Sequence, residues 1–349
     1  MTACCVGCQP WIWLQMQSGW SLRWSCCLLT TQIWKHQICE GCCKRAPSPW
    51  EKVLSGVPQG TVLGPHLFLL FINDIGDEIT SNIRLFADDC LIYRAIKGPE
   101  DETILQNDLS RLVKWTETWG MHFNSKKCNV MRISNKKKQH QVSYKMMDDC
   151  LQHINSCQYL GIHIQSNLKW NLQSQYAASK ASRVLGFVRR NFHHAPLVTK
   201  EKLYHTLVRP HLEYGIAAWD PYLIRDIDML ERVQRKAARF VTGNYSRNTS
   251  VTAMMEQLGW KSLQARRRAH RLTCLYKIQH NGMAISKEFM NPKVTRSRRG
   301  HNQQFQLYSA RLDLFKNSFF PRTIREWNEL SSSMVSQTSC AAFKRGILA

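Results

Sequence analysis

The sequence predicts an α+β fold, with an antiparallel sheet and its helices first and a mostly helical region after it. Three observations support this prediction. Between residues 50 and 165, short stretches rich in β-branched and aromatic residues alternate with helical apolar patterns. Beyond Trp170, apolar stripes at helical spacing prevail. Apolar residues make up 44% of the 349, which is ample for two or three buried cores.

The elements of the first region follow the order helix, hairpin, helix, strand, hairpin. The loop SGVPQG leads into the first helix, which begins near Pro65. Pro99 opens the second helix, whose leucines and tryptophans share one face. The remaining stretches are rich in strand-forming residues and are bounded by turn residues. These elements are expected at residues 65–75, 83–93, 99–119, 123–133 and 156–165.

The charge balance indicates a polyanionic partner. Lys and Arg number 48 against 25 acidic residues, a formal charge of +23 that exceeds what solubility requires. Two amphipathic helices, at 177–190 and 230–241, have cationic flanks, and ARRRAHR at 265–271 is a third basic run. A packed helix with a solvated face explains each one alone, but three in succession favour phosphate contact. The expected contacts to a nucleic-acid backbone are Arg183, Arg189, Arg190, Arg232, Arg235, Lys236 and Arg239.

The first 49 residues differ in composition from the rest. Eight of the 14 cysteines lie before residue 44, among five tryptophans, and we find neither helical nor strand periodicity there. Cys5 with Cys8 and Cys39 with Cys42 have the C-x-x-C spacing of zinc ligands, although the gap between the pairs is long for a zinc ribbon. We interpret this segment as a misjoined or frameshifted coding stretch, with a zinc module as the alternative.

Membrane and secretion signals are missing from the sequence pattern. No apolar run reaches the ~20 residues that a membrane span needs, and the N-terminus lacks the layout of a signal peptide. We therefore expect an intracellular protein, in the nucleus, the cytoplasm or both, without a membrane partner. In a reducing compartment its cysteines are expected to be free or metal-bound.

The stretch LFADDCLIY, residues 85–93, places Asp88 and Asp89 side by side between strand-like arms. A bare turn favours Gly or Asn beside an Asp, so the doublet needs another explanation. A tight hairpin tip can turn two consecutive carboxylates toward one point, and Mg²⁺ binds one or two carboxylates together with substrate phosphates. Polar hairpin tips are common, so the doublet alone indicates metal chemistry only weakly.

The doublet is one of four motifs whose combination is specific. In order, SGVPQGTVLGP, LFADDCLIY, FNSKKC and YLG resemble the reverse transcriptase palm of non-LTR (LINE-type) retrotransposons, particularly the jockey and chicken-repeat-like groups. The resemblance spans about residues 50 to 345 and lacks the family's fingers and endonuclease, as in an N-terminally truncated enzyme. It implies a Cys/Trp-rich segment, a partial polymerase palm, a helical thumb-like region and a basic C-terminal segment. Their expected boundaries are 1–49, 50–168, 169–282 and 283–349.

The resemblance implies roles for single residues. Asp88 corresponds to the principal metal ligand, Asp89 to its neighbour, and Lys127 to the lysine that protonates the departing pyrophosphate. The glycine-rich loop handles the template and the incoming nucleotide, and YLG is similar to the primer grip. The corresponding residues are Gly56, Pro58, Gln59 and Gly60 for the loop, and Tyr159, Leu160 and Gly161 for the grip.

The resemblance also implies a cofactor and partners. The cofactor is Mg²⁺ in a two-metal site, which steadies the attacking hydroxyl and the leaving phosphate. The partners are an RNA template, a DNA primer and dNTP. An element-encoded RNA-binding protein, or an intact element enzyme acting in trans, is a further expected partner.

One departure from the family pattern bears on activity. Polymerases of this family have another aspartate on the first palm strand, upstream of the glycine-rich loop, but here no aspartate precedes Asp74. The upstream acids, Glu40 and Glu51, lie outside strand-like stretches. Losing one member of a unit that acts together typically lowers the rate by orders of magnitude. We therefore expect an RNA-directed DNA polymerase by descent with little or no activity, or alternatively a non-catalytic nucleic-acid-binding protein.

Overall fold

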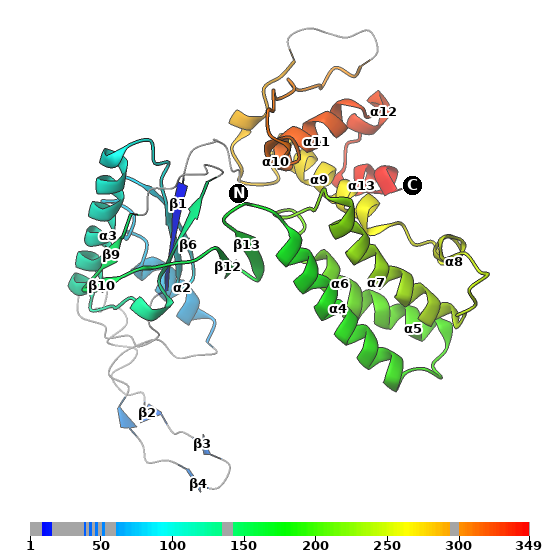
Figure 1. The fold of residues 1–349 in the computed structure, drawn as a ribbon, viewed down its shortest axis with the longest axis horizontal. Coiled ribbons are helices and arrows are strands. Elements are labelled where there is room, and N and C mark those ends of the chain that lie inside the picture. The colour runs from blue at the N-terminus through cyan, green and yellow to red at the C-terminus, as the bar shows by residue number, and fades with distance from the viewer. Residues whose placement is uncertain are drawn as a thin grey trace. The chain divides into compact units, whose positions relative to one another are not determined.

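The computed structural model describes residues 61–134, 142–293 and 300–348, and upstream of them the backbone of five short strands. The chain divides into two compact units, one within residues 5–157 and the other built mainly from the residues after 157. Both units are drawn in Figure 1. Small sheets and helices are combined, as the α+β prediction requires. Among the described residues, no helix combines the length and the apolar character that a membrane crossing needs.

A five-stranded sheet organises the first unit. Its strands are β1 (Gln9–Gln15), β6 (Asn82–Phe86), β7 (Asp89–Tyr93), β8 (Asn129–Ile133) and β11 (Gln152–His153). In space their order is β11-β8-β1-β7-β6. Neighbouring strands run antiparallel except β11 and β8, which run parallel. The sheet is therefore mainly antiparallel, as the sequence predicts.

The first 49 residues contribute to this sheet, which their sequence did not lead us to expect. β1 is the middle strand and pairs with β7 on one side and β8 on the other. We found no strand periodicity in this segment, yet Gln9–Gln15 forms a strand. The reason is that WIWL is a continuous apolar run, which is typical of a strand inside a sheet and shows no alternation. Cys5 and Cys8, half of the hypothetical zinc site, lie outside the described residues.

Shorter strands pair separately from the main sheet. These two-stranded pairs are β2 (Ile38–Cys39) with β5 (Glu51–Lys52), β3 (Cys42–Cys43) with β4 (Ala46–Pro47), and β9 (Lys145–Met146) with β10 (Asp149–Cys150). Strand β9 is joined to the helix that carries Gln106. The Gln106 side chain donates to the Lys145 carbonyl and accepts from the Lys145 N–H, each at 2.9 Å.

Helix α3 (Pro99–Trp119) starts and ends where the sequence predicts. Pro99 occupies the first turn, followed by three acidic residues that favour the positive end of the helix dipole. Gly120 ends the helix with a φ of 65°, a left-handed conformation that glycine adopts without steric cost. A shorter helix, α2 (Leu63–Phe71), precedes the β6–β7 hairpin.

Helix α3 covers one face of the sheet. Its Leu105, Leu109 and Leu112 are fully buried. They belong to the same apolar cluster as Cys90 and Ile92, alternate residues of β7. Because side chains alternate along a strand, Asp89 and Leu91 point to the opposite face. This alternation fixes the side of the sheet on which the acidic doublet lies.

A buried aspartate on α3 holds the start of β6. The Asp108 carboxylate is fully buried and accepts hydrogen bonds from the backbone N–H groups of Thr80 at 3.1 Å and Ser81 at 2.8 Å. It also pairs with Arg111 at 3.0 Å. Burial alone would raise the pKa of Asp108, but the hydrogen bonds from Ser81 and Thr80 outweigh it and hold that pKa below its ordinary value. The carboxylate therefore stays ionised and fixes the strand leading to the hairpin tip.

The second unit is mostly helical after one hairpin. The hairpin consists of β12 (Ser156–Tyr159), which begins at the unit boundary, and β13 (Ile162–Gln165). The longer helices are α4 (Asn171–Asn191), α7 (Ile224–Thr242), α9 (Leu263–Gln279) and α11 (Phe319–Asn328). The shorter elements are α5 (Leu197–Leu203), η2 (Tyr204–Val208), α6 (Arg209–Glu213), α8 (Val251–Gln257), η3 (Lys287–Phe289), α10 (Asp313–Lys316), α12 (Ser332–Val335) and α13 (Cys340–Leu348).

Two apolar cores hold these helices. The first joins α4, η2, α6 and α7 around fully buried side chains such as Ala181, Leu212 and Ala237. The second joins α9 to α11 and α13, where Trp327 and Phe343 are fully buried with ring centroids 5.5 Å apart. Helices α11 and α13 are therefore packed onto α9.

The run from α5 to α6 contains a π-helical turn, η2, between two α-helical pieces. Pro210 lies at the start of α6. A proline inside a helix has no N–H to donate, and its ring crowds the carbonyl four residues earlier. The widened turn that precedes Pro210 lets the helix continue past the proline, as such bulges do in other helices.

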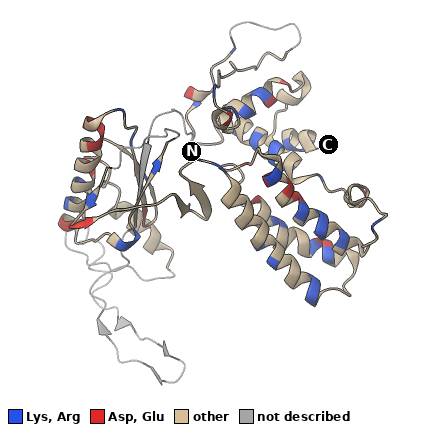
Figure 2. Ribbon diagram, in the orientation of Figure 1, with Lys and Arg blue, Asp and Glu red and all other residues tan. Residues whose placement is uncertain are grey.

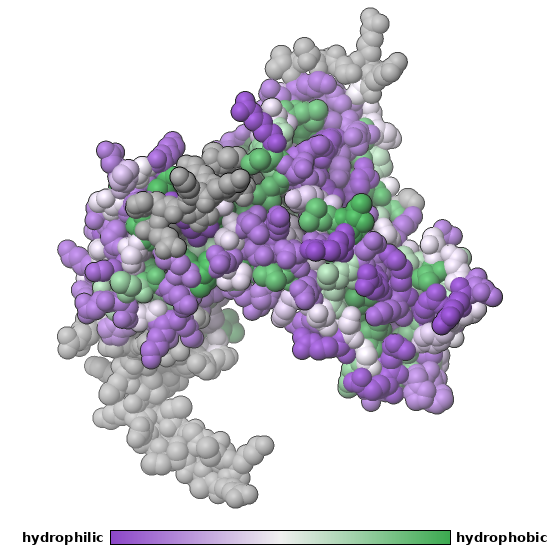
Figure 3. All heavy atoms as spheres, viewed as in Figure 1, coloured by the Kyte–Doolittle hydropathy of each residue, from purple (hydrophilic) through white to green (hydrophobic). Residues whose placement is uncertain are grey.

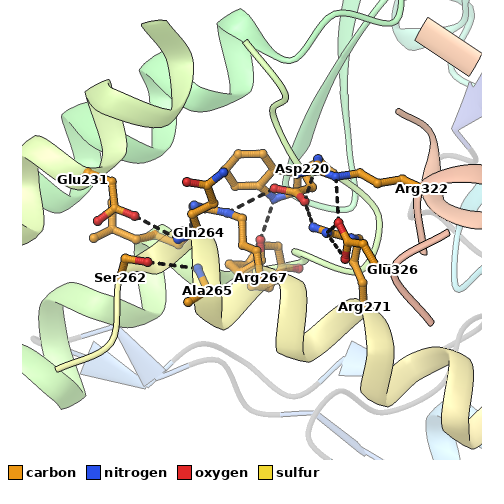
Figure 4. A network of polar contacts seen from close by, with 12 residues as sticks. Asp220, Glu231, Ser262, Gln264, Ala265, Arg267, Arg271, Arg322 and Glu326 are labelled. Atoms are coloured by element: carbon orange, nitrogen blue, oxygen red, sulfur yellow. Dashed lines mark hydrogen bonds and ion pairs between the residues drawn. The ribbon is translucent and has the colours of Figure 1, made fainter. Parts of the chain in front are cut away.

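Ion pairs buried between α9, α11 and Asp220 link the two cores (Figure 4). Arg267 and Arg271 are 1% and 2% exposed. Asp220 pairs with Arg271, with Arg322 at 3.1 Å and with Arg267 at 3.8 Å. Glu326 accepts two hydrogen bonds from Arg271, at 2.7 and 2.8 Å. Within ARRRAHR, these two arginines are therefore structural, which corrects the prediction of phosphate contact for that run.

Candidate active site

The acidic doublet lies at the tip of the β6–β7 hairpin. Phe86 pairs with Asp89, so Ala87 and Asp88 are the two residues of the turn. Ala87 has a φ of 50°. The left-handed region costs a residue with a side chain about 1–2 kcal/mol, and glycine would avoid that cost. Such local strain is typical of functional sites, where the surrounding structure holds it in place.

The two carboxylates are electrostatically coupled. Asp88 is in the turn and Asp89 is the first residue of β7, and both are half-buried. Burial, and then repulsion from Asp88, raise the pKa of Asp89, while the Lys127 ammonium acts in the opposite direction. Repulsion between the two carboxylates therefore adds to burial in raising the pKa of Asp89. A bound cation would relieve that repulsion.

Lys127, the predicted proton donor, lies near the acidic tip. It is the last residue of η1 (Ser125–Lys127), it is separated from β8 by Cys128, and it is exposed. In the sheet, Gln15 pairs with Asp89, and Trp13 pairs with Asn129. The Lys127 ammonium lies near enough to Asp89 to act on its carboxylate electrostatically. The structure thus brings together the three residues predicted to be catalytic.

Among the described residues, the hairpin tip supplies two carboxylates, Asp88 and Asp89. One or two carboxylates with substrate phosphates suffice for one Mg²⁺, and Asp88 with Asp89 meets that requirement. Within the described ranges, however, no cluster of three or more Asp, Glu, His or Cys residues could hold a metal. β1, the strand beside Asp89, contains no acidic residue at all. The strand that neighbours the doublet therefore supplies no carboxylate for a second metal ion.

Cys90, next to the doublet, has no chemical role at neutral pH. Its side chain is fully buried. Burial raises its pKa to about 12, and the neighbouring Cys128 thiol and Asp89 add to the effect. A thiol with such a pKa stays protonated, whereas nucleophilic attack and metal binding need the thiolate. Cys90 is therefore a core residue whose burial anchors β7 below the tip.

The glycine-rich loop cannot be placed relative to this tip. Gly56, Pro58, Gln59 and Gly60 lie outside the described residues. Their expected contacts with the template and the incoming nucleotide stay predictions.

The YLG motif forms the turn of the β12–β13 hairpin. Leu160 and Gly161 are its two central residues, with φ of 47° and 77°. Two positive φ values are typical of a type I′ turn, which glycine accepts and leucine accepts at a cost. Tyr159 is buried at the end of β12. The turn therefore has a sharply defined backbone. Its contact with a primer stays a prediction.

Tyr214, which the sequence reasoning missed, holds this turn. Its hydroxyl donates to the Leu160 carbonyl at 3.1 Å. A Cβ on Gly161 would lie 3.1 Å from the Tyr214 ring, and a Cβ on Gly215 would lie 2.7 Å from Ile162. Glycines at both positions are therefore needed for the two segments to approach. The signal in the sequence was the Tyr-Gly pair in LEYG, which pattern alone does not connect to YLG.

Most of the predicted backbone-contact residues are exposed. Arg183, Arg189, Arg190, Arg232, Arg235 and Lys236 are all on the surface of α4 or α7. Figure 2 shows Lys and Arg along α7 and at the C-terminal end of α4. The surface over these helices is largely hydrophilic, with smaller apolar patches (Figure 3).

Three of these residues have partners within the chain, and the first, Arg189, lies 5.7 Å from the centroid of the Tyr245 ring. Arg235 pairs with Asp228 at 3.0 Å, an exposed contact that contributes little to stability. Arg239 is half-buried and donates to the Ser246 carbonyl at 3.0 Å. The remaining set still forms a cationic surface suited to phosphates.

Comparison with known proteins identifies the first unit. A family model described as "Reverse transcriptase (RNA-dependent DNA polymerase)" matches residues 20–164. These residues are a reverse transcriptase domain. The match begins 30 residues before the point at which the motifs become recognisable, so part of the segment 1–49 belongs to the domain. The interpretation of the first 49 residues as a misjoined stretch stays a prediction.

Individual relatives of the reverse transcriptase domain come from transposons. The chain is 26% identical over 220 residues to "Probable RNA-directed DNA polymerase from transposon X-element" of Drosophila melanogaster, covering 59% of this chain and 24% of that protein. It is 25% identical over 205 residues to "RNA-directed DNA polymerase from mobile element jockey" of the same species, covering 55% of this chain and 22% of the relative. The Drosophila funebris jockey polymerase is 24% identical, with 54% and 22% covered.

These relatives confirm the predicted resemblance to jockey-type retrotransposon polymerases. The chain spans about a quarter of the length of each relative it matches. The chain is thus similar, over part of its length, to proteins that are named as RNA-directed DNA polymerases.

Proposed function

We propose that this chain is an RNA-directed DNA polymerase by lineage that binds nucleic acid and retains little or no polymerase activity of its own. The observation that carries the proposal is the hairpin tip, where Asp88, Asp89 and Lys127 interact beside a strand without a carboxylate. The first unit then corresponds to a partial palm. The helices between residues 169 and 282 correspond to a thumb, and residues 283–349 to a basic C-terminal segment.

In this proposal, Asp88 and Asp89 would hold Mg²⁺ together with the phosphates of a bound nucleotide. When bound, the ion would neutralise the phosphates and activate the primer hydroxyl. Lys127 contributes a proton donor whose ammonium is already attracted to the acidic tip. Its role is to place a proton where the pyrophosphate departs, since a charged lysine near phosphates is a suitable general acid.

The reason for low activity is the donor set. A two-metal site needs carboxylates that bridge both ions, and the doublet alone supplies ligands for one. Units whose members act together lose most of their rate when one member is removed. The chain should therefore bind template, primer and dNTP better than it joins them.

Primer extension on an RNA template with Mg²⁺ tests this proposal. The expected result is no cDNA above the level of the Asp88→Ala variant. Robust cDNA synthesis that Asp88→Ala abolishes would overturn the claim of low activity. Adding an intact element polymerase distinguishes a partner role, since a stimulated yield in its presence would support assistance in trans.

The alternative is a non-catalytic nucleic-acid-binding protein in which the basic helices are the functional part. The exposed arginines of α4 and α7 support it. Binding to such a surface falls steeply with salt, because phosphate contacts release counterions. If binding ignores both Mg²⁺ and the Asp88→Asn change, this alternative is favoured over the polymerase. Either function places the chain inside the cell, in the nucleus or cytoplasm, where its RNA and DNA partners are found.

A further inference from the structure

The loop between α7 and α8, residues 243–250, presents an exposed tyrosine. Tyr245 is 54% exposed, although the helix before it ends in a buried core. Arg247 follows two residues later and is also exposed. An exposed tyrosine ring close to cationic side chains is a candidate contact for a ligand, since tyrosine is enriched at binding surfaces.

Hydrogen bonds fix the shape of this loop. The Asn244 side chain accepts from the Ser246 N–H at 3.0 Å and donates to the Thr249 hydroxyl at 3.2 Å. Arg239 of α7 donates to the Ser246 carbonyl at 3.0 Å. The backbone on both sides of Tyr245 is therefore held before any ligand arrives. Such preorganisation lowers the entropy lost on binding.

A cation from a second helix lies against the tyrosine. The Arg189 guanidinium, at the C-terminal end of α4, is 5.7 Å from the centroid of the Tyr245 ring. This contact orients the ring by a cation–π interaction and joins the loop to α4. Arg190 is the next residue and is exposed. The ring therefore contacts one cation directly, and Arg190 and Arg247 are exposed cations close to it in the sequence of α4 and of the loop.

We propose that Tyr245, backed by Arg189, is a stacking platform for an unpaired nucleobase in single-stranded nucleic acid. Arg190 and Arg247 contact the adjoining phosphates. Single-stranded nucleic acids are typically bound by aromatic rings on which bases stack, beside cations that follow the backbone. A duplex does not fit this chemistry, because its base faces are already covered by neighbouring bases. The inference rests on the proposed nucleic-acid binding and names one contact within it.

Fluorescence anisotropy with labelled oligonucleotides tests the platform. The probes are a single-stranded RNA of roughly 12 nucleotides and a blunt duplex of the same length, measured at one salt concentration. For Tyr245→Ala we expect about tenfold weaker binding of the single strand, equivalent to 1.4 kcal/mol, and unchanged binding of the duplex. Tyr245→Phe keeps the ring and should bind as the parent does.

A matched control lies on α4. Phe187 is 52% exposed and precedes Arg189 by two residues, so it lies about 200° around the helix from it. Phe187→Ala removes an exposed ring of similar size and should leave single-strand affinity unchanged. An equal loss in Phe187→Ala would show a nonspecific effect of exposed aromatic rings and would overturn the assignment.

A double-mutant cycle sharpens the result. Replacing one nucleotide at a time by an abasic residue should weaken binding of the parent at one position. In Tyr245→Ala, the same abasic change should have no further effect. If Tyr245→Ala weakens single strand and duplex alike, the ring has a structural role and the platform is refuted. If the parent binds neither probe, the proposed nucleic-acid binding fails as well.

Discussion

Replacing Asp220 by Asn should destabilise the helical unit through the arginines that it neutralises. Asp220 pairs with Arg271, Arg322 and Arg267. Arg271 keeps Glu326 as a partner, whereas Arg267 keeps a hydrogen bond to the Leu212 carbonyl at 3.1 Å, a contact with the Trp219 ring and the attraction of nearby carboxylates that do not pair with it directly. Burial already lowers the pKa of Arg267 to about 10, against the attraction of nearby carboxylates. The substitution therefore leaves one cation buried with little compensation.

The magnitude follows from the burial of the arginine. The Arg267 side chain is 1% exposed, so solvent screening gives it almost no relief. Removing one partner of a buried pair typically costs about 3–5 kcal/mol, and we take about 3 kcal/mol because neighbouring acids remain. For a unit of roughly this size, that change lowers the unfolding temperature by about 6–12 °C. Differential scanning calorimetry would measure the shift in the transition of the helical unit.

Two further variants make this experiment decisive. Asp228→Asn removes an exposed ion pair, in which the Arg235 side chain is 48% exposed and the Asp228 side chain 51% exposed. It should cost less than about 1 kcal/mol. Adding Arg267→Met to Asp220→Asn should recover part of the loss, because the unpaired charge is then removed. Equal effects of Asp220→Asn and Asp228→Asn would refute the reasoning from burial.

Three other predictions test the hairpins and their support. Asp88→Asn should lower the pKa of Asp89 only part of the way to the ordinary aspartate value, since burial is the larger cause of its rise. NMR titration of the carboxyl group measures this pKa, and an unchanged value would show that the two residues are uncoupled. Tyr214→Phe should raise hydrogen exchange in residues 156–165 while changing global stability by less than about 1.5 kcal/mol; unchanged exchange would contradict a clamp on Leu160. Asp108→Asn should cost about 1–3 kcal/mol in urea unfolding, and a neutral result would mean its buried bonds are replaceable.

The pKa shifts give two opposite pH dependences. The pKa of Asp89 is raised in the folded chain, so its contribution favours folding at low pH and is lost as the pH rises through the raised value. The pKa of Asp108 is lowered, so its contribution is present above the ordinary aspartate pKa and is lost as the pH falls through the lowered value. In Asp108→Asn, the second dependence should disappear from the unfolding curve.

The sequence predicted the local elements of the site well and the tertiary contacts poorly. The hairpin tip and the bounds of α3 follow from turn residues, Pro99 and leucine spacing, which act within a few residues. β1 was missed because an apolar run without alternation does not distinguish a central strand from other buried segments. Tyr214 was missed because its partner, Leu160, lies 54 residues away in the sequence. The division into four segments with the boundaries given above stays a prediction.

The basic residues show most clearly what pattern alone leaves open. Arg189 and Arg271 both lie in basic runs on amphipathic helices, and both seemed suited to phosphates. Arg189 is exposed at the end of α4 and faces a solvent-accessible ring, whereas Arg271 is buried between Asp220 and Glu326. A buried carboxylate partner that is distant in sequence distinguishes a structural arginine from one that is available to phosphates. The formal charge of +23 therefore overstates the surface available to nucleic acid, and binding should depend on the exposed cations of α4, α7 and the 243–250 loop.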